Sequence, residues 1–232
     1  MTSDPKILGL AFLGGIIPSL LWLWFWLKED KKNPEPKGIL TMVFVAGMLA
    51  VIFVLPIQKF IQGNIDSREL QFILWASAEE IIKYLAVIAV LYKTTYADEA
   101  IDWPIYMITA ALGFAALENA LFLIKPLSMS ENAVSLLTGQ FRFLGSTLLH
   151  TVSSGILGIA LGISLHMKRL KKLYLVAGFI LAIALHSVFN FFIIGVEAGR
   201  ADYFLEVLKI FSFFWVAAVI VMLLFEKVRR MG

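Results

Sequence analysis

The stretch Ala76-Ser77-Ala78-Glu79-Glu80-Ile81-Ile82-Lys83 lies inside an apolar run from about Leu70 to Tyr92. This run is long enough to cross a bilayer, because about 20 helical residues span its hydrocarbon core. Each charge at the centre of such a span costs about 2.5–3.5 kcal/mol on the mildest insertion scale. Lys83 lies one helical turn beyond Glu79 and Glu80 and shares a face with both. We therefore predict a membrane-spanning helix whose charged face packs against other helices.

The composition of the chain is that of an integral membrane protein. Of its 232 residues, 60% are hydrophobic, against about 45–50% in a soluble domain. The segments between apolar runs are short, so we expect one membrane domain over residues 1–232. The net charge of +3 comes from basic loop residues and does not indicate a nucleic-acid partner. The chain contains no cysteine, which excludes disulfides, iron–sulfur clusters and thiolate catalysis.

Seven apolar segments predict an all-α, polytopic bundle of about seven transmembrane helices. They cover approximately Ile7–Leu27, Ile39–Ile57, Leu70–Tyr92, Trp103–Ile124, Val134–Leu165, Leu173–Val196 and Phe204–Phe225. The fifth segment is long enough to be one tilted helix or an interfacial lead-in followed by a span. Its small residues Ser154, Gly158 and Gly162 predict close packing against another helix.

The basic residues of the loops predict the orientation of the bundle. They cluster after the first span, after the fifth span and at the carboxyl terminus. With seven spans the three clusters share one side, which the positive-inside rule makes cytoplasmic. We therefore expect the amino terminus outside and the carboxyl terminus in the cytoplasm. The loops Gln58–Arg68, Lys125–Asn132 and Glu197–Tyr203 then face outward, and Pro126 is expected to end the fourth span.

Strongly polar residues at membrane depth are confined to the third, fourth, fifth and sixth spans. They are Glu79, Glu80, Lys83, Glu118, Asn119, Arg142, His150, His186 and Asn190. His186 and Asn190 are four residues apart and project from one helical face. Arg142 is interpreted as snorkelling toward the interface. Serine and asparagine would join helices at a lower cost than three glutamates and two histidines, so we predict a buried polar site.

Four short motifs in this set resemble the PrsW family of intramembrane proteases, which is related to CAAX prenyl endopeptidases and bacteriocin-processing proteases. The matching pieces are Glu79-Glu80-Ile81-Ile82-Lys83, Phe114-Ala115-Ala116-Leu117-Glu118-Asn119, His150 and His186-Ser187-Val188-Phe189-Asn190. They occur on four successive spans between about residues 70 and 195, which we predict to be the catalytic core. The second piece favours PrsW over the prenyl-protein branch. Ala78 stands where some members carry a third glutamate.

The resemblance implies a glutamate-dependent protease in a prokaryotic plasma membrane. We expect it to need no cofactor, with zinc as the alternative discussed below. Its implied partners are the lipid bilayer and a single-span membrane protein substrate. In some relatives that substrate is an anti-sigma factor, whose first cut starts a stress response. The implied catalytic residues are Glu79, Glu80, Glu118, His150, His186 and Asn190, with Lys83 and Asn119 in support.

The chemistry of the residues themselves also favours hydrolysis. A carboxylate that is shielded from bulk water can act as a general base toward a trapped water molecule. We predict this role for Glu80, with Glu79 as the alternative, and expect His150 to orient the water. The other predicted roles are oxyanion stabilisation by His186 and Asn190, control of a histidine tautomer by Glu118 and moderation of carboxylate charge by Lys83.

Three other functions are compatible with a buried cluster of glutamate and histidine. Both residue types bind zinc, so a zinc-dependent membrane protease is an alternative, although the chain has no His-Glu-x-x-His motif. A proton-coupled transporter also uses intramembrane glutamate and histidine, but inverted repeats typical of such proteins are not evident. A membrane scaffold whose site has lost its chemistry is the third alternative.

Overall fold

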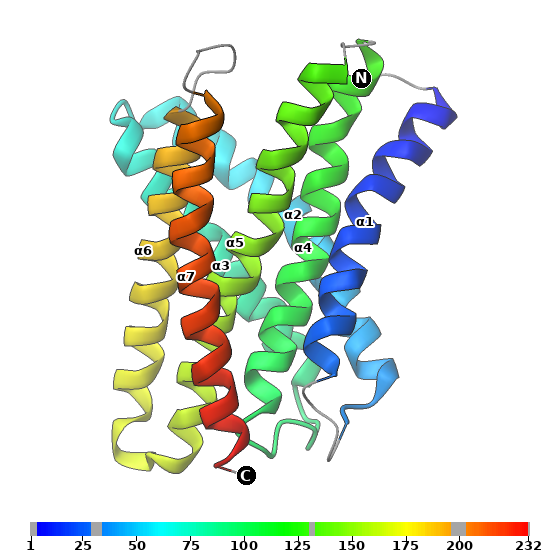
Figure 1. The fold of residues 1–232 in the computed structure, drawn as a ribbon. Helices are drawn as coiled ribbons and strands as arrows, with labels where there is room; N and C mark the ends of the chain where they lie inside the picture. The colour runs from blue at the N-terminus through cyan, green and yellow to red at the C-terminus, as the bar shows by residue number, and fades with distance from the viewer. Residues whose placement is uncertain (1–3, 29–33, 130–132, 196–202, 232) are drawn as a thin grey trace.

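The fold is a bundle of α-helices that run in alternating directions along the chain (Figure 1). The computed structural model describes residues 4–28, 34–129, 133–195 and 203–231. For residues 133–144, 168, 194–195 and 203–204 it describes the backbone but not the side chains. Its helices are α1 (Pro5–Leu27), α2 (Lys37–Asn64), α3 (Arg68–Leu91), α4 (Asp102–Ser128), α5 (Ala133–His166), the short 3-10 helix η1 (Lys168–Leu170), α6 (Lys171–Gly195) and α7 (Tyr203–Arg229).

The predicted all-α, polytopic fold is confirmed. Among the described residues, six helices are long and apolar enough to cross a membrane, and no strand occurs. The exception is α3, whose 24 residues include Glu79, Glu80 and Lys83 and are therefore less apolar. The fifth apolar segment is one helix of 34 residues rather than two.

Two predicted helix ends were wrong. The segment from Gln58 was expected to be a loop, but α2 continues to Asn64. Pro126 was expected to end the fourth span, but it lies inside α4, which ends at Ser128. Polar residues near the end of α2 do not break the helix because they face a cavity described below, where polar side chains need no lipid contact.

Helix α4 lies at the centre of the bundle and contacts α1, α2, α3 and α5. Every residue from Pro104 to Ala116 is buried, as expected of a helix that is apolar on all sides and surrounded by protein. Where α2 crosses α4, Gly47 meets the backbone of Ala110 and Gly113 meets the backbone of Phe44. A side chain at either glycine would push the two backbones apart, so these residues set the crossing.

The packing predicted for the small residues of the fifth span is confirmed. Gly158 lies against the backbone of Pro104 at the start of α4, and Gly162 lies against the backbone of Ala100 just before it. This close approach holds α5 beside α4. It thereby places the middle of α5, which carries His150, next to the middle of the bundle.

The described residues of the three basic clusters lie toward one end of the bundle, as the odd number of spans predicts. Figure 1 shows the carboxyl terminus, the α1–α2 connection and the α5–α6 connection at its lower end. Helices α2, α4 and α6 finish at the opposite end. The side of the membrane that each end faces stays a prediction.

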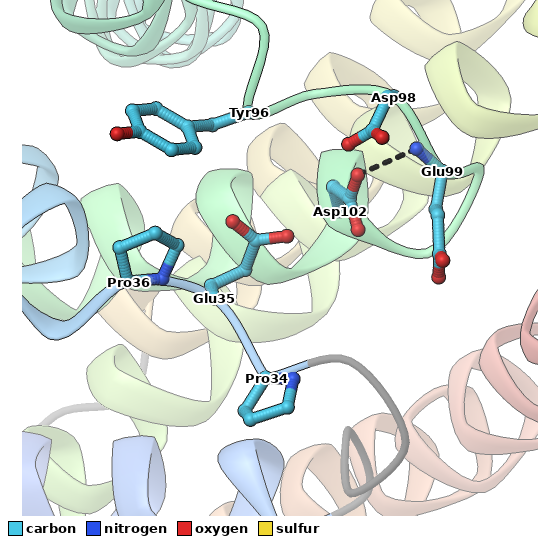
Figure 2. A pocket seen from close by; sticks show the side chains of 7 residues that line it. All are labelled: Pro34, Glu35, Pro36, Tyr96, Asp98, Glu99 and Asp102. Atoms are coloured by element: carbon cyan, nitrogen blue, oxygen red, sulfur yellow. Dashed lines mark hydrogen bonds between the residues drawn. The ribbon is translucent and has the colours of Figure 1, made fainter.

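An acidic pocket of about 390 Å³ lies at the end that carries the basic clusters (Figure 2). Its lining residues are Pro34, Glu35, Pro36, Tyr96, Asp98, Glu99 and Asp102. The hydroxyl of Tyr106 donates hydrogen bonds to the Glu35 carboxylate and to the Tyr96 carbonyl. The backbone N–H of Glu99 donates to Asp102 Oδ2 at 2.6 Å. These contacts join the α1–α2 connection to the α3–α4 connection.

Candidate active site

A cavity of about 920 Å³ opens toward the end where α2, α4 and α6 finish. Five helices line it, because α3 and α5 also pass along its wall. Its polar lining residues are Gln58, Lys59, Gln62, Trp75, Glu79, Glu118, Asn119, Lys125, Ser146, His150, His186 and Asn190. The cavity therefore brings together predicted site residues from four helices, and adds residues from α2 that the sequence analysis did not place there.

Glu80 is fully buried and forms hydrogen bonds through both carboxylate oxygens. Its Oε1 accepts from Lys83 Nζ at 2.5 Å and from Ser153 Oγ at 3.0 Å. Ser154 Oγ donates to Oε2 at 2.7 Å. Glu80 does not line the cavity. Its contacts are those of an anchor that joins α3 to α5, since a buried charge persists only when it is paired and hydrogen-bonded.

Glu79 is also buried, but its two oxygens differ. Its Oε1 accepts a hydrogen bond from Gln58 Nε2 at 2.7 Å. Its Oε2 has no hydrogen-bond partner among the described residues. This second oxygen lies 3.4 Å from His186 Nε2 and 3.9 Å from His150 Nδ1. Glu79 lines the cavity, and its unpartnered oxygen is buried in the wall beside the two histidines.

The hydrogen bonds of His150 assign its tautomer. An ammonium group has no acceptor, so Lys83 Nζ, at 3.2 Å, donates to His150 Nδ1. The hydrogen of the ring is then on Nε2, which donates to Glu118 Oε2 at 2.9 Å. Glu118 also accepts from Ser146 Oγ at 3.2 Å. The contact that the predicted role of Glu118 requires, a hydrogen bond to a histidine, is therefore present.

His186 has the opposite tautomer. Its Nδ1 donates to Glu80 Oε1 at 2.9 Å, which leaves Nε2 with a lone pair that faces Glu79 Oε2. The rings of His186 and His150 are 5.1 Å apart between centroids. Two acceptors facing each other at 3.4 Å repel unless a proton, a water molecule or a cation lies against both. Asn190, one turn after His186, lines the same cavity.

The same residues include a possible metal site. Glu79, His150 and His186 each offer one ligand atom, and these atoms lie within 4.8 Å of one another. Two imidazoles and a carboxylate are a donor set that zinc accepts. The unpartnered oxygen of Glu79 and the lone pair of His186 Nε2 fit such an ion.

The remaining predicted residues have mixed outcomes. Asn119 is buried and donates from Nδ2 to Thr147 Oγ1 at 3.0 Å, which joins α4 to α5. The side chain of Arg142 lies outside the described residues. Gln58 and Ser153 touch the two glutamates and were missed. Both are uncharged, and Gln58 is also far in sequence from the motifs. The one signal for Ser153 was its place beside Ser154 on the helix of His150.

The sequence of the chain is similar to those of several known proteins. The chain is 28% identical to Protease PrsW of Geobacillus kaustophilus over 206 residues. This match covers 88% of this chain and 87% of the relative. It is 31% identical over 191 residues to Protease PrsW of Clostridioides difficile, covering 78% and 77%. For Protease PrsW of Oceanobacillus iheyensis the identity is 30% over 187 residues, covering 78% and 81%. No solved structure gave a significant match.

The family profile that matches is described as PrsW family intramembrane metalloprotease. Its match extends over residues 35–225, which includes α2 to α6 and most of α7. All the predicted site residues lie within this range. The chain therefore belongs to the PrsW family of intramembrane proteases.

Proposed function

We propose that this protein hydrolyses a peptide bond of a single-span membrane protein, with Glu79 as the general base. One observation carries the proposal, namely the buried and unpartnered Oε2 of Glu79, which faces His186 Nε2 in the wall of the cavity. A water molecule that donates one hydrogen to each of these acceptors relieves their repulsion. It is thereby held next to the group that would remove its proton.

We assign the general base to Glu79, whereas the sequence analysis favoured Glu80. Glu80 accepts four hydrogen bonds, from Lys83, Ser153, Ser154 and His186, and lies away from the cavity. A carboxylate that already accepts four hydrogen bonds and does not line the cavity is poorly placed to take a proton from water. Its proposed role is therefore to hold His186 in the tautomer whose lone pair faces Glu79.

The proposed reaction needs two further groups. When Glu79 takes a proton from the water, the oxygen of the water bonds to the carbonyl carbon of the substrate, and the carbonyl oxygen becomes an anion. The amide of Asn190 is a donor that can stabilise this oxyanion. Glu79 then gives its proton to the nitrogen of the breaking peptide bond, which leaves as an amine. Glu118 keeps His150 in place beside the site throughout.

A zinc-dependent version of the same function is the second candidate. Glu79, His150 and His186 would hold the ion, which requires that Lys83 first gives up its hydrogen bond to His150 Nδ1. A bound zinc ion supplies a Lewis acid that polarises a carbonyl and lowers the pKa of water. In that case Glu80 and Glu118 orient the two histidines through hydrogen bonds at 2.9 Å, as carboxylates commonly do behind metal-bound histidines.

The position of the cavity supports a substrate cut on the outer side of a prokaryotic plasma membrane. The cavity opens at the end of the bundle opposite the basic clusters, which the positive-inside rule assigns to the cytoplasm. A substrate helix must unwind there, because its carbonyls are otherwise hydrogen-bonded. An anti-sigma factor with one transmembrane segment is a substrate of this kind.

Cleavage of a single-span reporter by the purified protein in lipid nanodiscs tests the function and its metal dependence together. With Glu79 as the base, a strong chelator leaves the rate unchanged and the protein carries less than stoichiometric zinc. Activity that is lost on zinc removal and restored by zinc alone would favour the second candidate. A protein that cuts no reporter with or without zinc contradicts both.

Gln58→Leu is expected to lower kcat by about 10–100-fold, the usual effect of removing a hydrogen bond that orients a reactive group. The reason is that Gln58 alone, among the described residues, donates to Glu79 Oε1. The control is Gln62→Leu, which changes another cavity residue one turn later on α2. Equal losses in the two variants would mean that the change in cavity polarity, rather than the bond to Glu79, matters.

A further inference from the structure

Two lysines at the mouth of the cavity have no part in the hydrolysis proposed above. Lys59 of α2 and Lys125 of α4 both line the cavity and both are exposed. Neither forms an ion pair within the described part of the chain. Two exposed ammonium groups without counter-charges, next to the candidate active site, are suited to bind a negatively charged group.

The crossing of α2 and α4 places the two lysines at matched positions. Lys59 follows Gly47 by twelve residues, and Lys125 follows Gly113 by twelve. Gly47 and Gly113 are the residues at which the two helices touch. Each ammonium-bearing residue therefore lies about 18 Å along its helix from the crossing, at 1.5 Å per residue. Both helices run toward the same end of the bundle (Figure 1), and both lysines line the cavity near that end.

The charges inside the cavity do not neutralise this pair. The acidic residues of its lining are Glu79 and Glu118. Glu79 is bound to Gln58, and Glu118 is bound to His150 and Ser146. The wall next to the lysines is apolar and includes Leu55, Leu121, Phe122, Leu123 and Pro126. The cavity thus has a basic mouth, an apolar wall and an inner polar site.

We propose that Lys59 and Lys125 select substrates that carry acidic residues next to the transmembrane segment. The proposal rests on the function proposed above and names the substrate class of that site. The apolar wall suits the unwound end of a transmembrane segment, and the residues that follow it along the substrate then pass between the two lysines. A carboxylate that passes beside either lysine gains a charge-assisted hydrogen bond, whereas a basic residue is repelled.

Two synthetic peptides that share one apolar transmembrane segment test this selection. One peptide continues with four glutamates and the other with four lysines. Binding is measured by fluorescence anisotropy on the Glu79→Gln variant, so that cleavage does not interfere, in zwitterionic and in anionic nanodiscs. The acidic peptide is expected to bind about tenfold more tightly, as two partly exposed ion pairs would produce.

Charge reversal provides the decisive comparison. Both lysines are changed to glutamate in the Glu79→Gln variant, by Lys59→Glu and Lys125→Glu. This double change is expected to reverse the preference, so that the lysine peptide binds more tightly. The matched control reverses Lys37 and Lys93, two exposed lysines at the other end of the bundle, and should leave the preference unchanged. The preference should also weaken in high salt, because exposed charges are screened.

Three results would overturn the proposal. They are equal affinity of the two peptides, an equal effect of the reversal on both peptides, and a preference that follows the charge of the lipids instead of that of the peptide. The last result would mean that the lysines meet lipid headgroups. Cleavage by the wild-type protein is scored separately. Charge-selective binding without cleavage of either peptide would contradict the proposed function and leave the charge selection standing.

Discussion

Glu79→Gln is expected to lower the rate of substrate cleavage by about 10²–10⁴-fold, the contribution of a positioned general base. Glutamine keeps the shape of the side chain and can still contact Gln58, but its amide cannot accept a proton from water. The stability of the protein should change little, because Oε2 of Glu79 has no partner to lose among the described residues. Initial rates of reporter cleavage and thermal unfolding in detergent measure the two effects.

The matched control for this variant is Glu69→Gln, which removes an exposed carboxylate from the first turn of the same helix. It should retain the wild-type rate. Wild-type activity of the Glu79→Gln variant would rule out Glu79 as the base. A large loss of stability in that variant would mean that Glu79 supports the fold rather than the chemistry.

The second large effect concerns the buried pair formed by Glu80 and Lys83. Both side chains are inaccessible to solvent, and their charged atoms are 2.5 Å apart. Glu80→Gln or Lys83→Gln alone should destabilise the protein by about 3–5 kcal/mol, because each leaves one buried charge without its counter-charge. Equilibrium unfolding in detergent and denaturant measures the loss.

A double-mutant cycle separates the ion pair from the loss of individual contacts. The variant with both Glu80→Gln and Lys83→Gln leaves neither charge buried, so it should be destabilised by clearly less than the sum of the two single variants. Additive losses would indicate that the two side chains act independently. Lys209, which pairs with Glu206 on the surface of α7, provides the control, because Lys209→Gln should cost at most about 1 kcal/mol.

The helices and the membership of the cluster follow from the sequence for simple physical reasons. Long apolar runs have few alternatives to transmembrane helices, and they predicted the helical bundle. Charged residues within such runs must meet one another because lipid cannot accommodate them. On that basis Glu79, Glu118, His150 and His186 were expected to lie together, and the structure brings them to one cavity.

The division of labour between the two adjacent glutamates does not follow from the sequence. Neighbouring residues on a helix point about 100° apart, since 3.6 residues make one turn. One carboxylate therefore faces the cavity while the other faces the serines of α5. Which is which depends on how α3 is rotated against its neighbours, and that rotation is set by tertiary contacts such as the bond from Trp75 Nε1 to the Gln58 carbonyl at 3.2 Å.

The contribution of α2 was hidden for a different reason. Gln58 is uncharged and comes directly after the apolar run Ile39–Ile57, so it was placed in the loop Gln58–Arg68. The helix in fact tolerates Pro56 in its interior and carries Gln58 into contact with Glu79. A polar residue that faces a cavity is not distinguished from a loop residue by its own sequence neighbourhood.

The most direct test of the account is mass spectrometry of the fragments formed from a single-span substrate in ¹⁸O-labelled water. We expect one new carboxyl terminus that carries one ¹⁸O atom. This terminus should lie in the outer third of the substrate's transmembrane segment or just outside it. The same analysis with the Glu79→Gln variant should give only intact substrate. A cut in the cytoplasmic third, or equal yields of labelled fragment from the two proteins, would contradict the account.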